Sequence, residues 1–92
     1  MRVMGVDPGL TRAGFAVVEQ IGGKLKALEF GTIRPEGDDV PAQLADLRAR
    51  LAGALGRHAP DAMAVERLFV TRNQRTAIRV GQASAMALLV AA

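Results

Sequence analysis

The sequence predicts an α/β domain with a mixed sheet, in which strands and helices follow the order βββαβα. Three observations lead to this prediction. Short apolar segments separated by turn residues open the chain, a leucine repeat with helical spacing follows, and another apolar segment precedes a second helical segment. A strand that follows a crossover helix is usually parallel to an earlier strand, whereas short connections join antiparallel neighbours. The predicted sheet therefore contains both kinds of pairing.

Three strands are predicted before the first helix. Residues Arg2–Asp7 are mostly apolar, and Pro8-Gly9 ends this first strand. Residues Ala13–Glu19 form the second strand, after which Gly22-Gly23 provides a tight turn. Residues Leu25–Ile33 alternate between apolar and polar side chains, which predicts a third strand with one more polar face. Because the connections are short, we expect an antiparallel meander.

A one-sided helix is predicted over Pro41 to Arg57, because leucines recur there at spacings of three and four residues, at Leu44, Leu47, Leu51 and Leu55. A proline in the first turn favours the helix start, and Pro60 ends the helix. Residues Ala62–Glu66 then form an apolar strand that finishes on an acid. The last helix is predicted to run from an N-cap at Asn73 to the end of the chain. A mixed sheet needs both faces covered, and two helices cover a four-stranded sheet only in part, so we expect further chain or a partner to supply the remaining cover.

The composition restricts the chemistry. The chain has 92 residues, half of them apolar, which suits one folded domain and excludes a disordered tail. It has no cysteine and one histidine, His58, which excludes a disulfide framework, a thiolate zinc site, a cysteine nucleophile and a histidine-based metal site or triad. Any metal must therefore be a hard cation held by carboxylates.

The sequence shows no export signal and no membrane-spanning segment, so we expect a soluble, cytoplasmic protein. Asp7 and Pro8 interrupt the apolar start before a signal peptide can form, and the most apolar segment, residues 83–92, is about half the ~20 residues that a membrane span needs. The net charge is +3, and ten of the twelve cationic side chains are arginines. Arginine suits phosphate recognition, although GC-rich coding produces the same bias.

Two carboxylates are the leading candidates for a functional site. Asp7 ends the first strand and is followed by a glycine that lets the backbone approach a ligand; Glu66 ends the fourth strand. If these strands are parallel neighbours, both acids emerge at the same edge of the sheet. Adjacent carboxylates repel and are normally reconciled by a divalent cation. The alternatives are a turn-starting role for Asp7 and an ion pair or capping role for Glu66.

The segment from Arg67 to Arg79 is a candidate nucleic-acid surface. It contains four arginines and no acid, together with Phe69, Asn73 and Gln74. Arginines and amides around an aromatic ring suit a phosphate backbone with a base that can stack. The alternative is a solvated helix start, with Phe69 in the core and Arg75 and Arg79 on an exposed face.

The segment Asp7–Thr11 has a D-x-G pattern that two chemistries share. In one, the acid binds a metal for phosphodiester cleavage; in the other, found in actin-like ATPases and sugar kinases, the loop cradles a phosphate of ATP. Taken together, however, the runs MRVMGVDPGLTRAGFAVVE, AVERLFVTRN and TAIRVGQASAMALLVAA resemble the N-terminal half of the RuvC family of Holliday-junction resolvases. The resemblance covers nearly the whole chain. The second and third runs are not expected in actin-like kinases or in the related YqgF family.

The resemblance implies an RNase H-like fold that stops before the last strand and the C-terminal helices. It also implies a homodimer and a metal-dependent endonuclease that nicks two strands of a four-way DNA junction symmetrically, in recombination and repair. The family's first two acids fall on Asp7 and Glu66, which would be catalytic and would bind Mg²⁺, or Mn²⁺ in its place, with two ions in a complete site. The resemblance further suggests a branch-migration helicase as partner.

The remaining site assignments lie in the second half of the chain. The family's junction-probing aromatic residue falls on Phe69 and its arginine on Arg72. Some relatives carry a second aromatic residue next to the first, at the position where this chain has Val70. With the amides and the next arginine, the expected DNA-binding set is Phe69, Arg72, Asn73, Gln74 and Arg75. The small-residue face of the last helix matches the family's dimer-forming helix, with Ala77, Gly81, Ser84 and Leu88 at the expected interface.

Length is the main departure from the family, since relatives are about twice as long and carry two further acidic ligands near their C-terminus. Two carboxylates make a weak magnesium site. We therefore interpret residues 1–92 as the N-terminal portion of one RNase H-like domain and expect this chain to be inactive, or nearly so, by itself. The competing hypotheses are a non-catalytic dimerisation or DNA-binding fragment and, less favoured, an actin-like ATP-binding fragment.

Overall fold

The structure is a computed structural model that describes residues 1–66 and 74–92. In chain order its elements are β1 (Arg2–Asp7), β2 (Ala13–Ile21), β3 (Lys24–Ile33), α1 (Val40–His58), β4 (Ala62–Val65) and α2 (Gln74–Ala91). The predicted order βββαβα is confirmed, and the predicted boundaries lie close to the observed ones. Across the described ranges, no helix has the length and apolar character needed to cross a bilayer.

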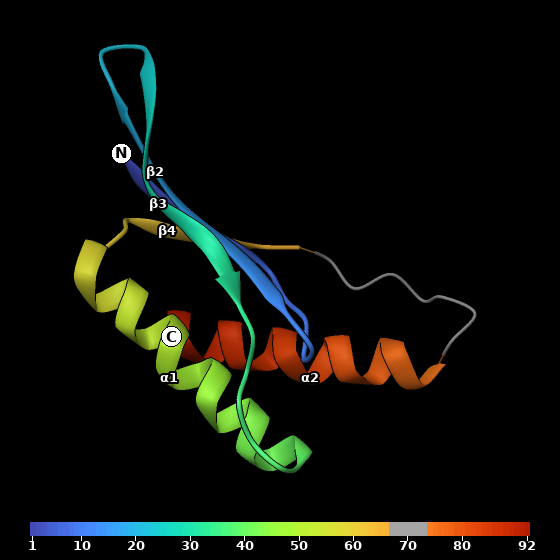
Figure 1. The fold of residues 1–92 in the computed structure, drawn as a ribbon. Coiled ribbons are helices and arrows are strands. Elements are labelled where there is room, and N and C mark those ends of the chain that lie inside the picture. Colours follow the sequence, from blue (N-terminus) through green and yellow to red (C-terminus); the bar gives the residue numbers. More distant parts are fainter. Residues whose placement is uncertain (67–73) are drawn as a thin grey trace.

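The four strands form one mixed sheet in the order β3-β2-β1-β4 (Figure 1). The pairs β1–β2 and β2–β3 are antiparallel, and β1–β4 is parallel, with Val6 opposite Val65. The predicted meander and the predicted parallel crossover are both confirmed. β1 is therefore a central strand, and β4 is an edge strand that pairs with β1 alone.

Both helices lie on one side of the sheet (Figure 1). The side chains of Met4 and Val6 point into the helical layer and are buried. Because side chains alternate along a strand, Gly5 and Asp7 belong to the opposite face. Residues 1–66 and 74–92 place no helix on that opposite face, which we call the open face.

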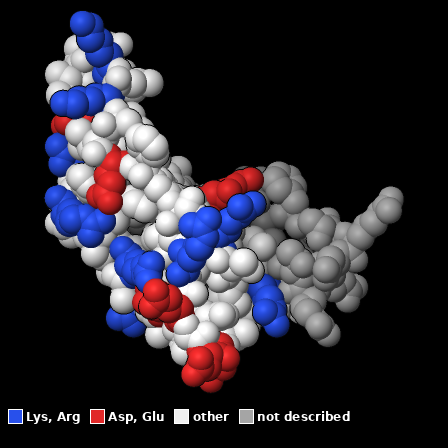
Figure 2. Space-filling model, viewed as in Figure 1, with Lys and Arg blue, Asp and Glu red and all other residues white. Residues whose placement is uncertain are grey.

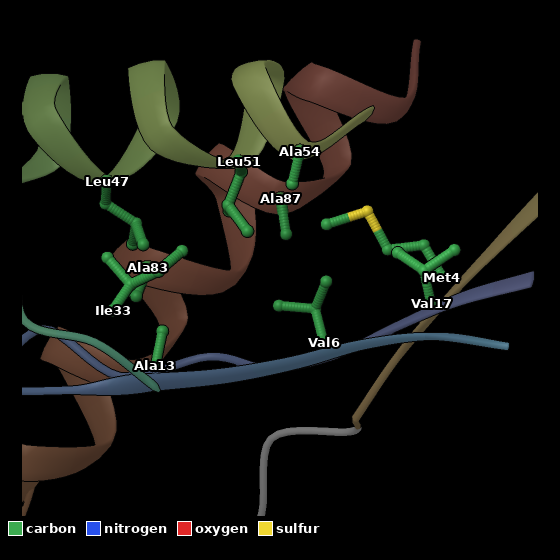
Figure 3. Packing of buried hydrophobic residues seen from close by; sticks show 10 residues of the cluster. All are labelled: Met4, Val6, Ala13, Val17, Ile33, Leu47, Leu51, Ala54, Ala83 and Ala87. Atoms are coloured by element: carbon green, nitrogen blue, oxygen red, sulfur yellow. The ribbon is translucent and has the colours of Figure 1, made fainter. Parts of the chain in front are cut away.

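The core lies between the sheet and the two helices (Figure 3). Leu47 and Leu51 of α1 are fully buried, as the leucine spacing predicts. Over residues 78–91 of α2, whose side chains the structure describes, the buried positions carry the small residues Ala83 and Ala87, so this part of the helix can lie close to its neighbours. The buried cluster consists of Met4, Val6, Ala13, Val17, Ile33, Leu47, Leu51, Ala54, Ala83 and Ala87.

Both ends of α1 have defined capping interactions. The Asp39 side chain accepts a hydrogen bond of 2.9 Å from the backbone N–H of Ala42, which satisfies one of the free donors at the helix start. Ala59 adopts a left-handed conformation with φ of 44°, and its N–H donates to the Leu55 carbonyl at 2.8 Å. The helix therefore ends just before Pro60, as predicted.

The β2–β3 hairpin extends beyond the helical layer (Figure 1). Gly22 and Gly23 have φ of 56° and 79°, the positive values that a tight type I′ hairpin turn requires. Near this turn Ile21 and Leu25 are exposed, because no helix reaches over the end of the hairpin. The expected alternation of buried and polar side chains along β3 is consequently absent there.

A charged network ties the end of α1 to β3. Arg57 donates to both carboxylate oxygens of Glu29 at 3.0–3.3 Å, and His58 Nε2 lies 2.7 Å from Glu29 Oε1. These interactions lower the pKa of Glu29, and the hydrogen bond from Arg57 has the largest effect. Figure 2 shows Lys and Arg side chains running from the hairpin towards α1 with acidic side chains among them. On this side of the molecule, cations such as Arg57 are neutralised within the protein.

Candidate metal centre

The sheet register brings Asp7 and Glu66 together. β1 and β4 are parallel, and the backbone N–H of Glu66, one residue beyond β4, donates to the Val6 carbonyl at 3.0 Å, so Glu66 stays hydrogen-bonded to β1. Asp7 follows Val6 and Glu66 follows Val65, at the carboxyl ends of adjacent strands. Both side chains belong to the open face, because their predecessors point towards the helices. The predicted meeting of these two acids is thus observed.

The two carboxyl groups interact directly. A hydrogen bond to Asp7, and then the negative charge of Asp7, raise the pKa of Glu66 above its ordinary value. The cause is that two negative charges held side by side repel, so a proton shared between them is favoured. A divalent cation removes the same repulsion without a proton, and the pair is exposed to solvent, where an ion can reach it.

The donor set suits a hard cation. Mg²⁺ prefers oxygen ligands, keeps several waters, and is commonly bound through one or two carboxylates together with substrate phosphates. Within residues 1–66 and 74–92, no group of three His, Cys, Asp or Glu side chains gathers at one point. Asp7 and Glu66 therefore fit a two-carboxylate magnesium site, and they leave most of the coordination shell to water or substrate.

A groove of about 620 Å³ extends from the acid pair across the open face. Its floor is made by small residues at alternate positions of β1, β2 and β4, and Phe30 of β3, which is 76% exposed, stands at one side. A Cβ atom added at Gly14 would lie 3.6 Å from the Cβ of Asp7, so glycine leaves extra space beside the acid. On the open face, the lining residues are Gly5, Asp7, Gly14, Ala16, Phe30, Thr32, Ala64 and Glu66.

Sequence reasoning missed this groove. A usable signal was present, because Gly5, Ala16 and Ala64 are small residues that alternate with buried apolar ones. The signal becomes interpretable only when the register is known, since it is the pairing of Gly5 with Ala16 and Ala64 that places the three side by side.

The loop between β1 and β2 follows Asp7 directly and is tightly closed. A Cβ atom at Gly9 would lie 2.1 Å from the carbonyl oxygen of Arg12, so only glycine fits at this position. Leu10 is 5% exposed and holds the loop to the body of the protein. The requirement for glycine at this position thus comes from the loop's own backbone, and the expected approach of the backbone to a ligand stays a prediction.

The other predicted site residues are placed only in part. Phe69, Arg72 and Asn73 lie outside the described residues, as does Arg67, the alternative ion-pair partner of Glu66. Gln74, Arg75 and Ala77 lie in the first turn of α2, where the structure describes the backbone. Further along the predicted interface face, Gly81 and Ser84 are half-buried, and Leu88 is 59% exposed.

Comparisons with known proteins agree with this geometry. The family model described as crossover junction endodeoxyribonuclease RuvC matches residues 3–92. The chain is 43% identical over 94 residues to a protein of that name from Thermobifida fusca, and 42% identical over 93 residues to one from Azorhizobium caulinodans. In both cases the match covers all of this chain, but 52% and 55% of the relatives. The chain thus spans about half the length of the curated relatives it matches.

A solved structure also matches the fold of this chain. A Thermus thermophilus RuvC structure, described as a complex with a Holliday junction substrate, superposes with a TM-score of 0.89 at 31% sequence identity. The superposition covers 99% of this chain and 59% of the Thermus chain. The predicted fold class, an RNase H-like mixed sheet that is truncated relative to the complete fold, is confirmed. On its sequence and its fold alike, the chain belongs to the RuvC family of crossover junction endodeoxyribonucleases.

Proposed function

We propose that this chain is the N-terminal portion of a metal-dependent endonuclease that resolves four-way DNA junctions by paired nicks, acting in the cytoplasm in recombination and repair. The observation that carries the proposal is the meeting of Asp7 and Glu66 at the end of a parallel strand pair, in a chain that matches the RuvC family over residues 3–92. Residues 1–92 form part of one domain in this proposal.

Asp7 and Glu66 would hold the catalytic cation, Mg²⁺ or Mn²⁺. When bound, a divalent cation activates water for attack on a phosphodiester and stabilises the departing oxygen, and two ions commonly share these tasks. The chain's own residues must supply two negative charges, and the neighbouring Asp7, which raises the pKa of Glu66, makes the second charge harder to form in the absence of a cation. A complete two-ion site requires more ligands than these two carboxylates provide. We therefore expect weak ion binding and little or no cleavage by this chain alone.

The open face has room for an extended ligand. The groove beside the acids is floored by small side chains, which lets a bulky chain come close to Asp7 and Glu66. We assign junction DNA as that ligand; the Thermus relative is described with a Holliday junction. Phe69, Arg72, Asn73, Gln74 and Arg75 remain the proposed DNA-contacting residues on the connection into α2.

We also propose a homodimer that uses the face of α2 carrying Ala77, Gly81, Ser84 and Leu88. Support comes from the apolar side chains on the outside of this helix, since Ile78, Leu88 and Leu89 are each more than half exposed. A two-fold dimer would present two acid pairs to a junction of matching symmetry. A branch-migration helicase is the proposed partner at the junction.

Metal titration of the purified chain tests the assignment of the acids. We expect Mn²⁺ to bind to the wild-type chain, followed by electron paramagnetic resonance, and binding to be lost in Asp7→Asn and in Glu66→Gln. Asp38→Asn, which removes one charge from an exposed loop, is the matched control and should bind Mn²⁺ like the wild type. Unchanged Mn²⁺ binding in both acid variants would refute the assignment.

Junction cleavage tests the reaction. A labelled four-way junction with Mg²⁺ should yield at most trace symmetric nicks with the chain alone, and Asp7→Asn should remove that trace. Robust cleavage that survives Asp7→Asn would place the chemistry elsewhere.

Among residues 1–66 and 74–92, Asp7 and Glu66 are joined by no third acid or histidine, and this favours one second candidate, a non-catalytic fragment that binds DNA or dimerises. That candidate predicts junction affinity in EDTA that Asp7→Asn leaves unchanged, with no response to Mg²⁺.

A further inference from the structure

A second cavity lies between α2 and the β1–β2 loop, the loop that directly follows Asp7. It has a volume of about 230 Å³ and is lined by Gly9, Leu10, Thr11, Arg12, Arg79 and Val80. We call it the loop–helix pocket. It brings together two arginines that are far apart in the sequence, one from the loop after Asp7 and one from α2. In Figure 1 the tip of this loop reaches α2.

Both walls of the loop–helix pocket are held in place. On the loop side, the backbone closes on itself at Gly9, and Leu10 is buried beneath it. On the helix side, Arg79 lies one turn before Ala83, which is fully buried in the core. A pocket between two fixed walls needs little reorganisation when a ligand binds, and this favours affinity.

The charge of the pocket is not neutralised within the described part of the chain. Arg2, Arg50 and Arg57 form ion pairs there, whereas Arg12 and Arg79 have none among residues 1–66 and 74–92. The undescribed residues 67–73 include no Asp or Glu, and neither does the whole sequence after Glu66. Two arginines and Thr11 among the residues that line a small cavity provide the donor groups that an anion-binding site needs.

We propose that the loop–helix pocket binds one backbone phosphate of the DNA strand that lies across Asp7 and Glu66. The guanidinium groups of Arg12 and Arg79 would hold the phosphate, because their planar forks match its oxygens. The inference rests on the proposed function and deepens it, since it states how the strand is held beside the acids.

The position of the pocket fits this role. Gly9 follows Asp7 by two residues and Arg12 by five, which limits their separations from Asp7 to about 7 Å and about 17 Å along a fully extended chain. Successive phosphates of one strand advance about 3.4 Å along a duplex axis. The phosphate in the pocket would therefore lie within a few nucleotides of the one beside the acids.

Binding of the 92-residue chain to a fluorescent four-way junction, in Ca²⁺ and at several salt concentrations, tests the proposal. We expect Arg12→Gln and Arg79→Gln each to weaken binding roughly fivefold to tenfold and to lower the salt slope by about 1. Duplex binding should fall by a similar factor, because a phosphate contact carries no sequence information. Arg48→Gln is the matched control; it removes an exposed arginine of α1 and should stay within about twofold of the wild type.

The phosphate itself is located by methylphosphonate substitution, which neutralises one backbone linkage at a time. Methylphosphonate at one position of the strand should lower the affinity of the wild-type chain. The same substitution should not lower the affinity of the Arg12→Gln, Arg79→Gln double variant any further. If every position affects both proteins equally, or if both arginine variants bind like Arg48→Gln, the pocket does not hold a DNA phosphate.

Failure of the pocket and failure of the proposed function give different results. Equal affinity of the wild-type chain for the junction and for duplex of the same length would overturn the junction function, and the methylphosphonate scan would still decide the pocket. If no DNA binds, inorganic phosphate serves as the probe and is followed by nuclear magnetic resonance of the arginine Nε–H groups. The signals of Arg12 and Arg79 should then shift while that of Arg48 does not, and their failure to shift would overturn the pocket.

Discussion

Replacing Gly9 by alanine tests whether the closed loop after Asp7 is required by the fold. The new Cβ would lie 2.1 Å from the Arg12 carbonyl oxygen, whereas real Cβ atoms essentially never come closer than 3.0 Å to such an atom. The obstacle is backbone and cannot rotate away, so the loop must open by about 1 Å. Overpacking of this kind costs about 1–3 kcal/mol. For a domain of this size, we expect the melting temperature to fall by about 4–8 °C for each kcal/mol.

Gly5→Ala is the matched control for this measurement. A Cβ atom at Gly5 would meet nothing within 4 Å, and alanine loses less chain entropy than glycine in a strand. Thermal unfolding followed by circular dichroism should therefore give a midpoint for Gly5→Ala at or slightly above that of the wild type, and a clearly lower one for Gly9→Ala. If both variants have the same melting temperature as the wild type, the Arg12 carbonyl does not lie against Gly9 as described.

Three further predictions concern the core and the two acidic sites. Leu47→Ala empties a fully buried position and should cost about 2.7–5 kcal/mol, measured as a lower urea midpoint with an unchanged slope. Arg57 lowers the pKa of Glu29, so ionised Glu29 stabilises the fold above its unfolded pKa of about 4.5, and this contribution is lost as the pH falls through its folded pKa. The free energy of unfolding of Glu29→Gln should therefore be lower than that of the wild type at neutral pH, and the two values should converge in acid. Because Asp7 raises the pKa of Glu66, Asp7→Asn should lower that pKa towards its ordinary value, so the ¹³C signal of the Glu66 carboxyl should titrate at a lower pH than in the wild type. An unchanged titration would show that the two groups do not interact.

Those features whose determinants are local could be predicted from the sequence. The leucine spacing identified α1, and the glycine pair identified the hairpin turn. The meeting of Asp7 and Glu66 was also predictable, because each acid directly follows an apolar strand and a crossover helix makes those strands parallel. Only the assumption that β1 and β4 are neighbours went beyond local information.

The features that sequence reasoning missed depend on how elements pack. The groove on the open face requires that both helices choose the other side of the sheet, which no single strand specifies. Arg12 and Arg79 line the same pocket because α2 packs next to the β1–β2 loop. The position of α2 depends on the packing of Ala83 and Ala87 in the core. The projecting hairpin results from strands that are longer than the helical layer beneath them.

The edge position of β4 has a consequence for the order in which the protein assembles and opens. The three-stranded meander closes through short loops, whereas β2, β3 and α1 all lie between β1 and β4 in the chain, so the β1–β4 pairing carries the larger loop-closure entropy. β4 is also the shortest strand and is held on one side only. Amide hydrogens of β4 are therefore expected to exchange sooner than those of β1 and β2. Each local opening of β4 separates Asp7 from Glu66 while the rest of the sheet persists, so the integrity of the acid pair depends on a short edge strand that is held by a single neighbour.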